Sequence, residues 1–178
     1  MADNTGFSHI LYFSPRIRLT RDGPKLNLDL TLHPEQVHAL EMQSGAKVTI
    51  PTRNIEALID TGATYSSVLD EIALQLGLNQ VGSVPIAGAH YHQQCPVYSV
   101  ELMMGPFHIP CSVVGLKPKH KPNIECLLGR DVLQFFTMYY VGPCQSFVLY
   151  HGIPPLYERP DPGDRIAPQK PPNQSPGT

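Results

Sequence analysis

Hydrophobic and polar residues alternate early in the chain. Between Leu26 and Leu32 every second residue is leucine, and the residues between the leucines are polar. This period of two is typical of a β-strand that buries one face. Other apolar runs bounded by turn-forming residues predict further strands. They lie at residues 47–50, 57–59, 97–103, 107–114 and 138–141, and at 146–150 after a turn at Gly142-Pro143.

Helical patterns are short and few. Apolar residues at positions 69, 72, 73 and 76 have the spacing of a helix face, and Gly77 is a typical helix end. Pro34 suits the first turn of a helix within residues 33–45, and residues 131–136 predict another short helix. The fold class that we expect is therefore mostly β and largely antiparallel, with two or three short helices.

The end of the chain lacks the apolar residues of a folded domain. From His151 onward it carries 8 of the chain's 19 prolines and few large apolar side chains. Such a segment cannot bury enough surface to offset the entropy lost on ordering it. We expect a folded domain at residues 24–151, an N-terminal extension at 1–23 and a proline-rich extended or disordered tail at 152–178.

Charge and composition exclude several classes of partner. The net charge of −2 does not favour binding to nucleic acid or to an anionic membrane, and no apolar run approaches the ~18 residues of a membrane span. The first residues lack the charged and apolar regions of a signal peptide.

The four cysteines form no C-x-x-C pair. We expect reduced thiols in a cytoplasmic protein, with two disulfides as the alternative if the protein is exported.

One segment carries candidate chemistry. The apolar run at residues 57–59 leads directly into Asp60-Thr61-Gly62-Ala63. A carboxylate at the end of a buried strand costs free energy unless it is hydrogen-bonded or functional. Taken alone, the segment has two interpretations: an Asx turn that ends a strand, or an active-site loop around a catalytic Asp60.

A second segment downstream favours the active-site interpretation. Leu127-Leu128-Gly129-Arg130-Asp131 leads into a predicted helix, and together with Asp60-Thr61-Gly62-Ala63 it resembles the paired motifs of the retropepsin-like (retroviral-type) aspartic proteases. The style of both motifs is most similar to bacterial members, and the resemblance spans residues 24–150. It implies a single-lobe acid-protease fold, a closed β-sheet domain that acts as a dimer.

The resemblance also implies roles for individual residues. Asp60 would be the catalytic carboxylate, and Thr61, Gly62 and Ala63 would form the active-site loop. Ala63 replaces the Ser or Thr of pepsin-type enzymes, so no side-chain hydroxyl supports the carboxylate, and we expect activity at mildly acidic pH. Near the site, Gly129, Arg130 and Asp131 would be structural, with Arg130 binding the active-site loop and Asp131 acting as a helix cap or first-turn anion.

A count of carboxylates predicts the assembly. Peptide hydrolysis of this type needs two carboxylates that share a proton, and the chain offers one Asp-Thr-Gly. The second Asp60 would come from an identical subunit in a homodimer, and the substrate would be a polypeptide. The long terminal segments leave three alternatives open: propeptides removed by self-cleavage, occupants of the cleft, or strands of a dimer interface unlike the viral one.

A lid over the substrate is expected between the two motifs. Residues 84–92 have the apolar and glycine-containing character of a flap, although an ordinary surface hairpin is an equal alternative. Apolar substrate pockets would use Val132 or Leu133 in addition to flap residues. The substrate-binding residues of the flap would be Val84, Ile86, Ala87, Gly88 and Ala89.

Two other functions stand beside the endopeptidase. One is a catalytically idle retropepsin-like domain that dimerises or binds peptides. The other is a metal hydrolase, for which His90 and His92 share a strand face, but no third ligand is evident. We therefore expect no metal and no other cofactor. The intact Asp-Thr-Gly favours the endopeptidase, because a scaffold needs no carboxylate there.

Overall fold

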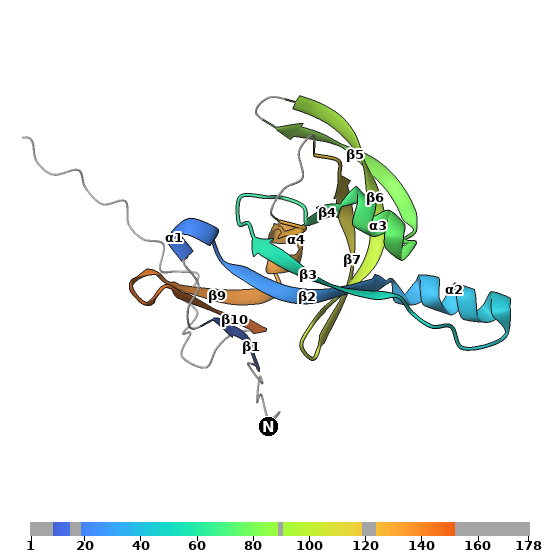
Figure 1. The fold of residues 1–178 in the computed structure, drawn as a ribbon, viewed down its shortest axis with the longest axis horizontal. Coiled ribbons are helices and arrows are strands. Elements are labelled where there is room, and N and C mark those ends of the chain that lie inside the picture. Colours follow the sequence, from blue (N-terminus) through green and yellow to red (C-terminus); the bar gives the residue numbers. More distant parts are fainter. Residues whose placement is uncertain (1–8, 15–18, 89–90, 119–123, 152–178) are drawn as a thin grey trace, which may run out of the picture.

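Strands make up most of the fold in the computed structural model (Figure 1). The structure describes residues 9–14, 19–88, 91–118 and 124–151, so the predicted tail at 152–178 lies outside the described residues. The strands are β1 (His9–Ser14), β2 (Lys25–Leu32), β3 (Thr52–Ile59), β4 (Ser67–Leu69), β5 (Gln80–Gly88), β6 (Tyr91–Met104), β7 (Phe107–Leu116), β8 (Cys126–Leu128), β9 (Phe136–Val141) and β10 (Ser146–His151). The helices are α1 (Leu19–Asp22), α2 (Pro34–Ser44), α3 (Asp70–Leu76) and α4 (Arg130–Leu133), with one 3-10 turn at Gly142–Cys144.

The larger sheet closes on itself. Its strand order is β2-β3-β8-β4-β7-β6-β5, and β2 also pairs with β6. Six of the strands therefore form a barrel, and β5 extends from it as the partner of β6. This arrangement confirms the expected closed, mostly β domain. Most pairs are antiparallel, but β3–β8 and β4–β7 are parallel.

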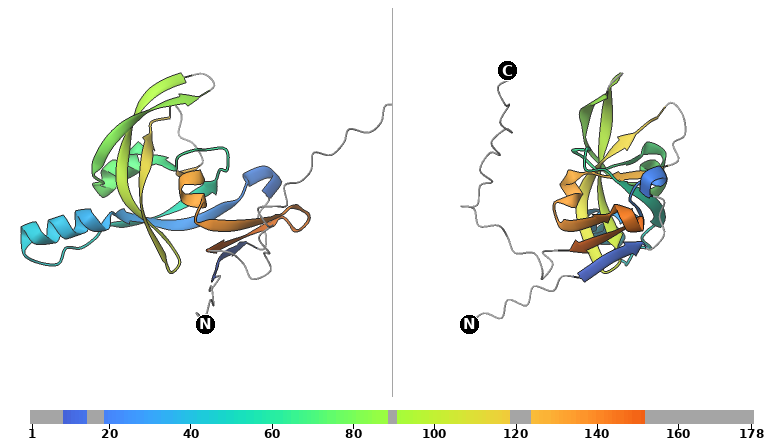
Figure 2. Two further views of the ribbon diagram at one scale, coloured as in Figure 1. Left: turned by 180° about the vertical axis from the view of Figure 1, so that it is seen from behind. Right: turned by 90° about the vertical axis from the view of Figure 1, so that its left-hand side faces the viewer.

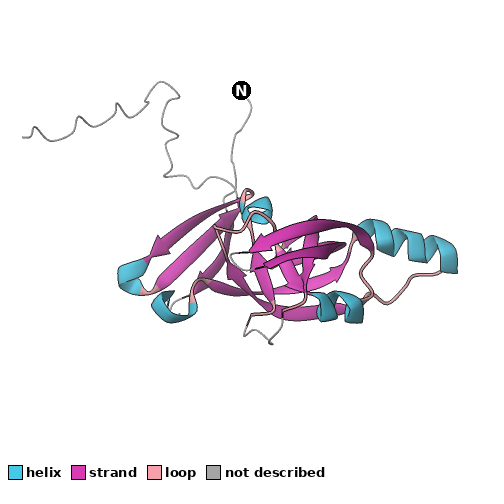
Figure 3. Ribbon diagram, turned by 90° about the horizontal axis from the view of Figure 1, so that it is seen from above, coloured by secondary structure: helices cyan, strands magenta, loops and turns pink. Residues whose placement is uncertain are grey.

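The smaller sheet has the order β1-β10-β9. The hairpin of β9 and β10 confirms the predicted pairing through the turn at residues 142–143. Figures 1 and 3 show this sheet at one end of the molecule and α2 projecting at the other. The view from behind in Figure 2 shows the same arrangement, with the β5–β6 hairpin rising from the barrel between the two ends.

The predicted alternation of β2 is confirmed by its burial. Leu26, Leu28, Leu30 and Leu32 are each buried, whereas Asn27 is exposed. The leucines pack in one core with residues of β3, β6 and β8, and Phe147 and Leu149 of β10 belong to the same core. The smaller sheet is therefore packed onto the barrel rather than separate from it.

The two longest helices, α2 and α3, have the predicted ends. Pro34 opens α2, and Gly45 ends it with a left-handed φ of 69°. Gly77 ends α3 with the same φ and caps it through its backbone N–H. These are positions that favour glycine because other residues are strained there. None of the helices among the described residues is long and apolar enough to cross a membrane.

Two sequence predictions need correction, and one short helix was missed. Residues 47–50 form no strand, because they belong to the irregular connection that returns from the projecting α2 and have no neighbouring strand to pair with. The helix predicted at 131–136 is the single turn α4, and Phe136 begins β9 instead. The short helix α1 was not predicted, since four residues are too few for a periodic pattern.

Candidate active site

Asp60 stands directly after β3, at the point where the two sequence motifs meet. β3 and β8 are parallel neighbours, with Ile59 aligned to Leu128. The backbone N–H of Asp60 donates to the carbonyl of Leu128 at 3.0 Å. Because parallel strands end at the same edge of a sheet, this pairing places Asp60 beside the segment that begins at Gly129.

The carboxylate of Asp60 is held by its own loop. Its Oδ1 accepts hydrogen bonds from the backbone N–H of Gly62 at 2.9 Å and of Ala63 at 3.3 Å. A Cβ at Gly62 would lie 3.1 Å from that oxygen, a tight contact that favours glycine here. The side chain is half-buried, while Thr61 and Gly62 are exposed. The loop therefore presents a fixed carboxylate toward open solvent in the single chain.

A second carboxylate holds the following part of the loop. Asp131 accepts from the backbone N–H of Ser66 at 2.9 Å and from its hydroxyl at 2.7 Å, and it also accepts from the N–H of Val132. Asp131 therefore does more than the predicted helix cap, because it ties α4 to the active-site loop. Ser66 is fully buried, and sequence reasoning missed it because a single serine carries no pattern.

Gly129 and Arg130 complete this connection. The N–H of Gly129 donates to the Ser66 hydroxyl at 2.9 Å, and a Cβ at Gly129 would lie 2.6 Å from the backbone of Tyr65. The guanidinium of Arg130 donates to the Thr64 hydroxyl at 2.8 Å, and its backbone N–H donates to the carbonyl of Ala63 at 3.0 Å. All three residues predicted to be structural near the site contact the loop that carries Asp60.

The predicted flap residues lie in the β5–β6 hairpin. In Figure 1 the far end of this hairpin leans toward the side on which the β3–β4 loop lies. Val84 and Ile86 are half-buried on β5, and Ala87 and Gly88 end that strand, whereas Ala89 lies outside the described residues. Val132 is 1 % exposed and part of the core, whereas Leu133 is half-buried, so of the two residues predicted for a substrate pocket Leu133 is the one with exposed surface.

The cysteines show no reactive character where they are described. Cys95, Cys111 and Cys126 are free thiols. Burial raises the pKa of Cys111 to about 12 and raises that of Cys126 further, so both stay protonated at neutral pH. Within the described ranges no group of His, Cys, Asp and Glu side chains could hold a metal ion. Asp60 therefore has no metal candidate beside it in this part of the chain.

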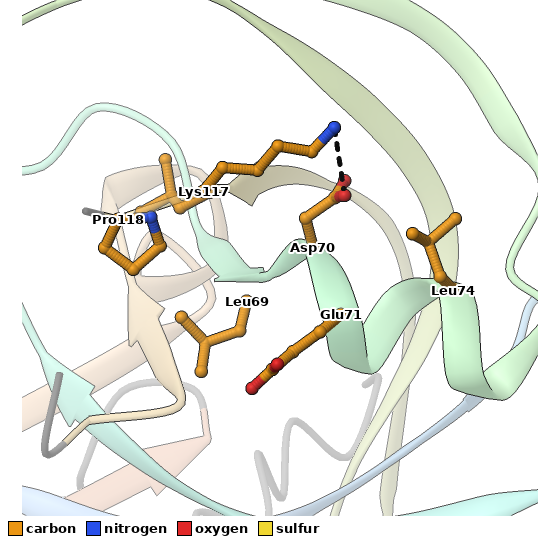
Figure 4. A pocket seen from close by; sticks show the side chains of 7 residues that line it. Leu69, Asp70, Glu71, Leu74, Lys117 and Pro118 are labelled. Carbon is orange, nitrogen blue, oxygen red and sulfur yellow. Dashed lines mark ion pairs between the residues drawn. The ribbon is translucent and has the colours of Figure 1, made fainter. Parts of the chain in front are cut away.

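A cavity of about 310 Å³ lies elsewhere, at the start of α3. Figure 4 shows Asp70 in the lining of this cavity, paired with Lys117, whose Nζ lies 3.3 Å from Asp70 Oδ2. Its lining does not include any of the residues predicted for the active site. It consists of Leu69, Asp70, Glu71, Leu74, Leu116, Lys117 and Pro118.

The chain resembles known proteins at the level of family and fold. Residues 46–135 match the family described as "gag-polyprotein putative aspartyl protease". No curated protein matches the chain. Among solved structures, a retropepsin-like aspartic protease from Rickettsia conorii has 17 % identity and a TM-score of 0.45, over 82 % of this chain and 94 % of that one.

Two viral proteases are also similar. The EIAV protease complexed with the inhibitor HBY-793 has 23 % identity and a TM-score of 0.39, over 46 % of this chain and 75 % of that one. The simian foamy virus (mac) protease has 17 % identity and a TM-score of 0.36, over 46 % of this chain and 82 % of that one. The family match spans just over half of the sequence, and the chain therefore belongs to the retropepsin-like aspartyl protease family of the gag-polyprotein type.

Proposed function

We propose that the protein is an aspartic endopeptidase whose active site combines Asp60 from two copies of the chain. The observation that carries this proposal is the geometry of Asp60 itself. Its carboxylate is fixed by two backbone N–H groups at the open end of β3, in a chain of the aspartyl protease family. These hydrogen bonds are those of an Asx turn, and the family match is what favours the catalytic interpretation of the fixed carboxylate.

The reaction would divide its proton transfers between the two carboxylates. One Asp60 accepts a proton from a water molecule as the water attacks the peptide carbonyl. The other, which carries the shared proton, donates it to the carbonyl oxygen. As the C–N bond breaks, the first Asp60 passes the proton taken from water to the leaving nitrogen, and the second recovers its proton from the hydroxyl of the intermediate. A single chain offers one such carboxylate, so the proposed reaction requires the proposed dimer. The protease domain would comprise residues 24–151, and the substrate would be a polypeptide.

The surrounding contacts support a fixed loop. Arg130, Asp131 and Ser66 join α4 to the segment that follows Asp60, so the carboxylate does not depend on its own turn alone. The β5–β6 hairpin would act as the flap, closing over an extended peptide and excluding water from the reacting bond. Val84 and Ile86 on this hairpin would favour apolar side chains beside the cleaved bond.

The direct test is cleavage of an unfolded protein substrate by the full chain. Asp60→Asn keeps the size of the side chain but cannot act as a base, so cleavage should fall by at least ~10³-fold. The matched control is Glu71→Gln, which removes a carboxylate from an exposed position on α3 and should leave the rate unchanged.

The pH dependence of the same assay tests the role of Ala63. Because no hydroxyl at this position supports the Asp60 anion, the rate should be maximal at mildly acidic pH.

Equal cleavage by wild type and Asp60→Asn would reject the mechanism. An inactive wild-type dimer that still binds peptides would instead show the catalytically idle module.

A further inference from the structure

The β5–β6 hairpin is attached to the barrel at its base. Among the described residues neither β7 nor β2 pairs with residues 91–96 of β6, which pair with β5 alone. At the base, Tyr98 of β6 is the register partner of Gln80, the first residue of β5. The hydroxyl of Tyr98 donates to the buried carboxylate of Asp70, at the start of α3. The β6 side of the base is therefore fixed to α3.

The β5 side of the base has the features of a hinge. Residues 77–79 join the end of α3 to the start of β5. Gly77 has a left-handed φ of 69°, and the register of β5 against β6 shifts between Gln80 and Gly82. A β-bulge of this kind bends its strand and interrupts the ladder of hydrogen bonds. The chain can therefore bend at two points between α3 and the regular part of the hairpin.

One side chain from another element bridges this hinge. Gln36, in the first turn of α2, donates from Nε2 to the carbonyl of Gly77 at 2.7 Å. Its Oε1 accepts from the backbone N–H of Asn79 at 3.1 Å. The neighbouring Val37 packs against the core, so the first turn of α2 is held in place while the rest of the helix projects. The amide of Gln36 thus ties both ends of the three-residue connection to a held helix turn.

We propose that Gln36 is a positioning residue of the protease, which sets how the β5–β6 hairpin lies over the bound substrate. The proposal rests on the proposed function, in which this hairpin is the flap. A flap contributes to binding only in the fraction of molecules in which it lies correctly, and the apparent affinity for substrate falls with that fraction. By bridging residues 77 and 79, Gln36 restricts the hinge and raises this fraction. Its hydrogen bonds go to the hinge and not to the loop of Asp60, so it acts through the flap.

Steady-state cleavage of a peptide substrate by the full chain tests this role. Gln36→Ala removes both hydrogen bonds and should raise KM about 10-fold, the effect of two hydrogen bonds of modest net strength, with kcat nearly unchanged. A merely structural role would instead lower the amount of active protein, which reduces the apparent kcat and leaves KM as it was. The matched control is Gln43→Ala, which changes an exposed glutamine of the same helix and should leave both constants unchanged.

Gln36→Glu supplies a readout that depends on pH. A carboxylate accepts from Asn79 but cannot donate to the carbonyl of Gly77, whereas a protonated carboxylic acid does both, as glutamine does. Because the ordinary pKa of glutamate is about 4.3, KM should be raised at about pH 6.5 and should return toward the wild-type value at about pH 4. Wild type measured at both pH values corrects for titration of His33 and Glu35 on α2 and of the catalytic pair.

Hydrogen exchange gives a readout that does not depend on activity. The N–H of Asn79 loses its acceptor in Gln36→Ala and should exchange faster there, but not in Gln43→Ala. Unchanged exchange at Asn79 would show that the bridge is not formed, and faster exchange with an unchanged KM would show that it does not position the flap.

Either of these results would overturn the proposal and leave the proposed function standing. A KM defect of Gln36→Glu that is equal at both pH values would overturn it in the same way. A wild-type chain that cleaves no peptide would instead reject the proposed function, and the role of Gln36 with it.

Discussion

The carboxylate of Asp70 is 4 % exposed and has two side-chain partners. The Tyr98 hydroxyl donates to it at 2.7 Å, and the Lys117 ammonium lies 3.3 Å away. Gly115 makes room for this group, because a Cβ there would lie 2.6 Å from the Tyr98 ring. One buried carboxylate therefore fixes the start of α3, which follows the active-site loop and β4, against β6 and β7.

Tyr98→Phe tests this group through stability and pH. Removing the hydroxyl leaves a buried carboxylate short of a partner and should lower the free energy of unfolding by about 1–3 kcal/mol at pH 8. Burial and the hydrogen bond to Asp70 raise the pKa of Tyr98 to about 12. Because the pKa of Tyr98 is raised on folding, its hydroxyl stabilises the fold fully at pH values below about 10, the pKa of tyrosine in the unfolded chain. This stabilisation is lost as pH rises toward 12.

The destabilising effect of Tyr98→Phe should therefore shrink between pH 8 and pH 11. Urea unfolding of wild type and variant at both pH values measures it, with the exposed Tyr65→Phe as the control that should change nothing. A stability difference that stays constant over this range would contradict the assignment.

Among the elements, α4 and the active-site loop behave as one unit. The carboxylate of Asp131 reaches from the helix to both the backbone and the hydroxyl of Ser66. Asp131→Ala leaves these donors unpaired in a largely buried place and should lower the free energy of unfolding by roughly 2–3 kcal/mol. Cleavage should fall as well, because the loop that positions Asp60 loses its anchor.

Asp131→Asn keeps the size of the side chain and one accepting oxygen but removes the charge. The amide oxygen still accepts, so its loss of stability should be about half that of alanine. Urea unfolding and initial cleavage rates measure both variants. An Asp131→Ala chain as stable and active as wild type would show that the helix does not support the loop.

The sequence predicts elements more completely than it predicts their pairing. The alternating leucines of β2 and the capping residues Pro34 and Gly77 act locally, and each of these predictions is confirmed. The parallel pairing of β3 with β8 joins distant segments and has no local signal, so only the family resemblance pointed to the meeting of Asp60 with Gly129. Residues 47–50 have strand-forming side chains but no partner strand, which periodicity alone does not show.

Across the whole molecule, the two ends differ in what they offer a partner. α2 projects at one end with no buried residue. The other end carries the smaller sheet of β1, β10 and β9, and Figure 1 shows the β3–β4 loop and α4 on that same side of the barrel. The chain holds one Asp-Thr-Gly, and its loop faces solvent. An active molecule would therefore be larger than one chain.

The most direct test of a shared dyad is a titration of wild type with Asp60→Asn at constant total concentration, after subunits have exchanged. If each active site needs Asp60 from both copies, mixed dimers are inactive and the rate follows the square of the wild-type fraction. An equal mixture should then retain about one quarter of the wild-type rate. A rate of about one half, linear in the wild-type fraction, would show that one chain suffices and would contradict the account.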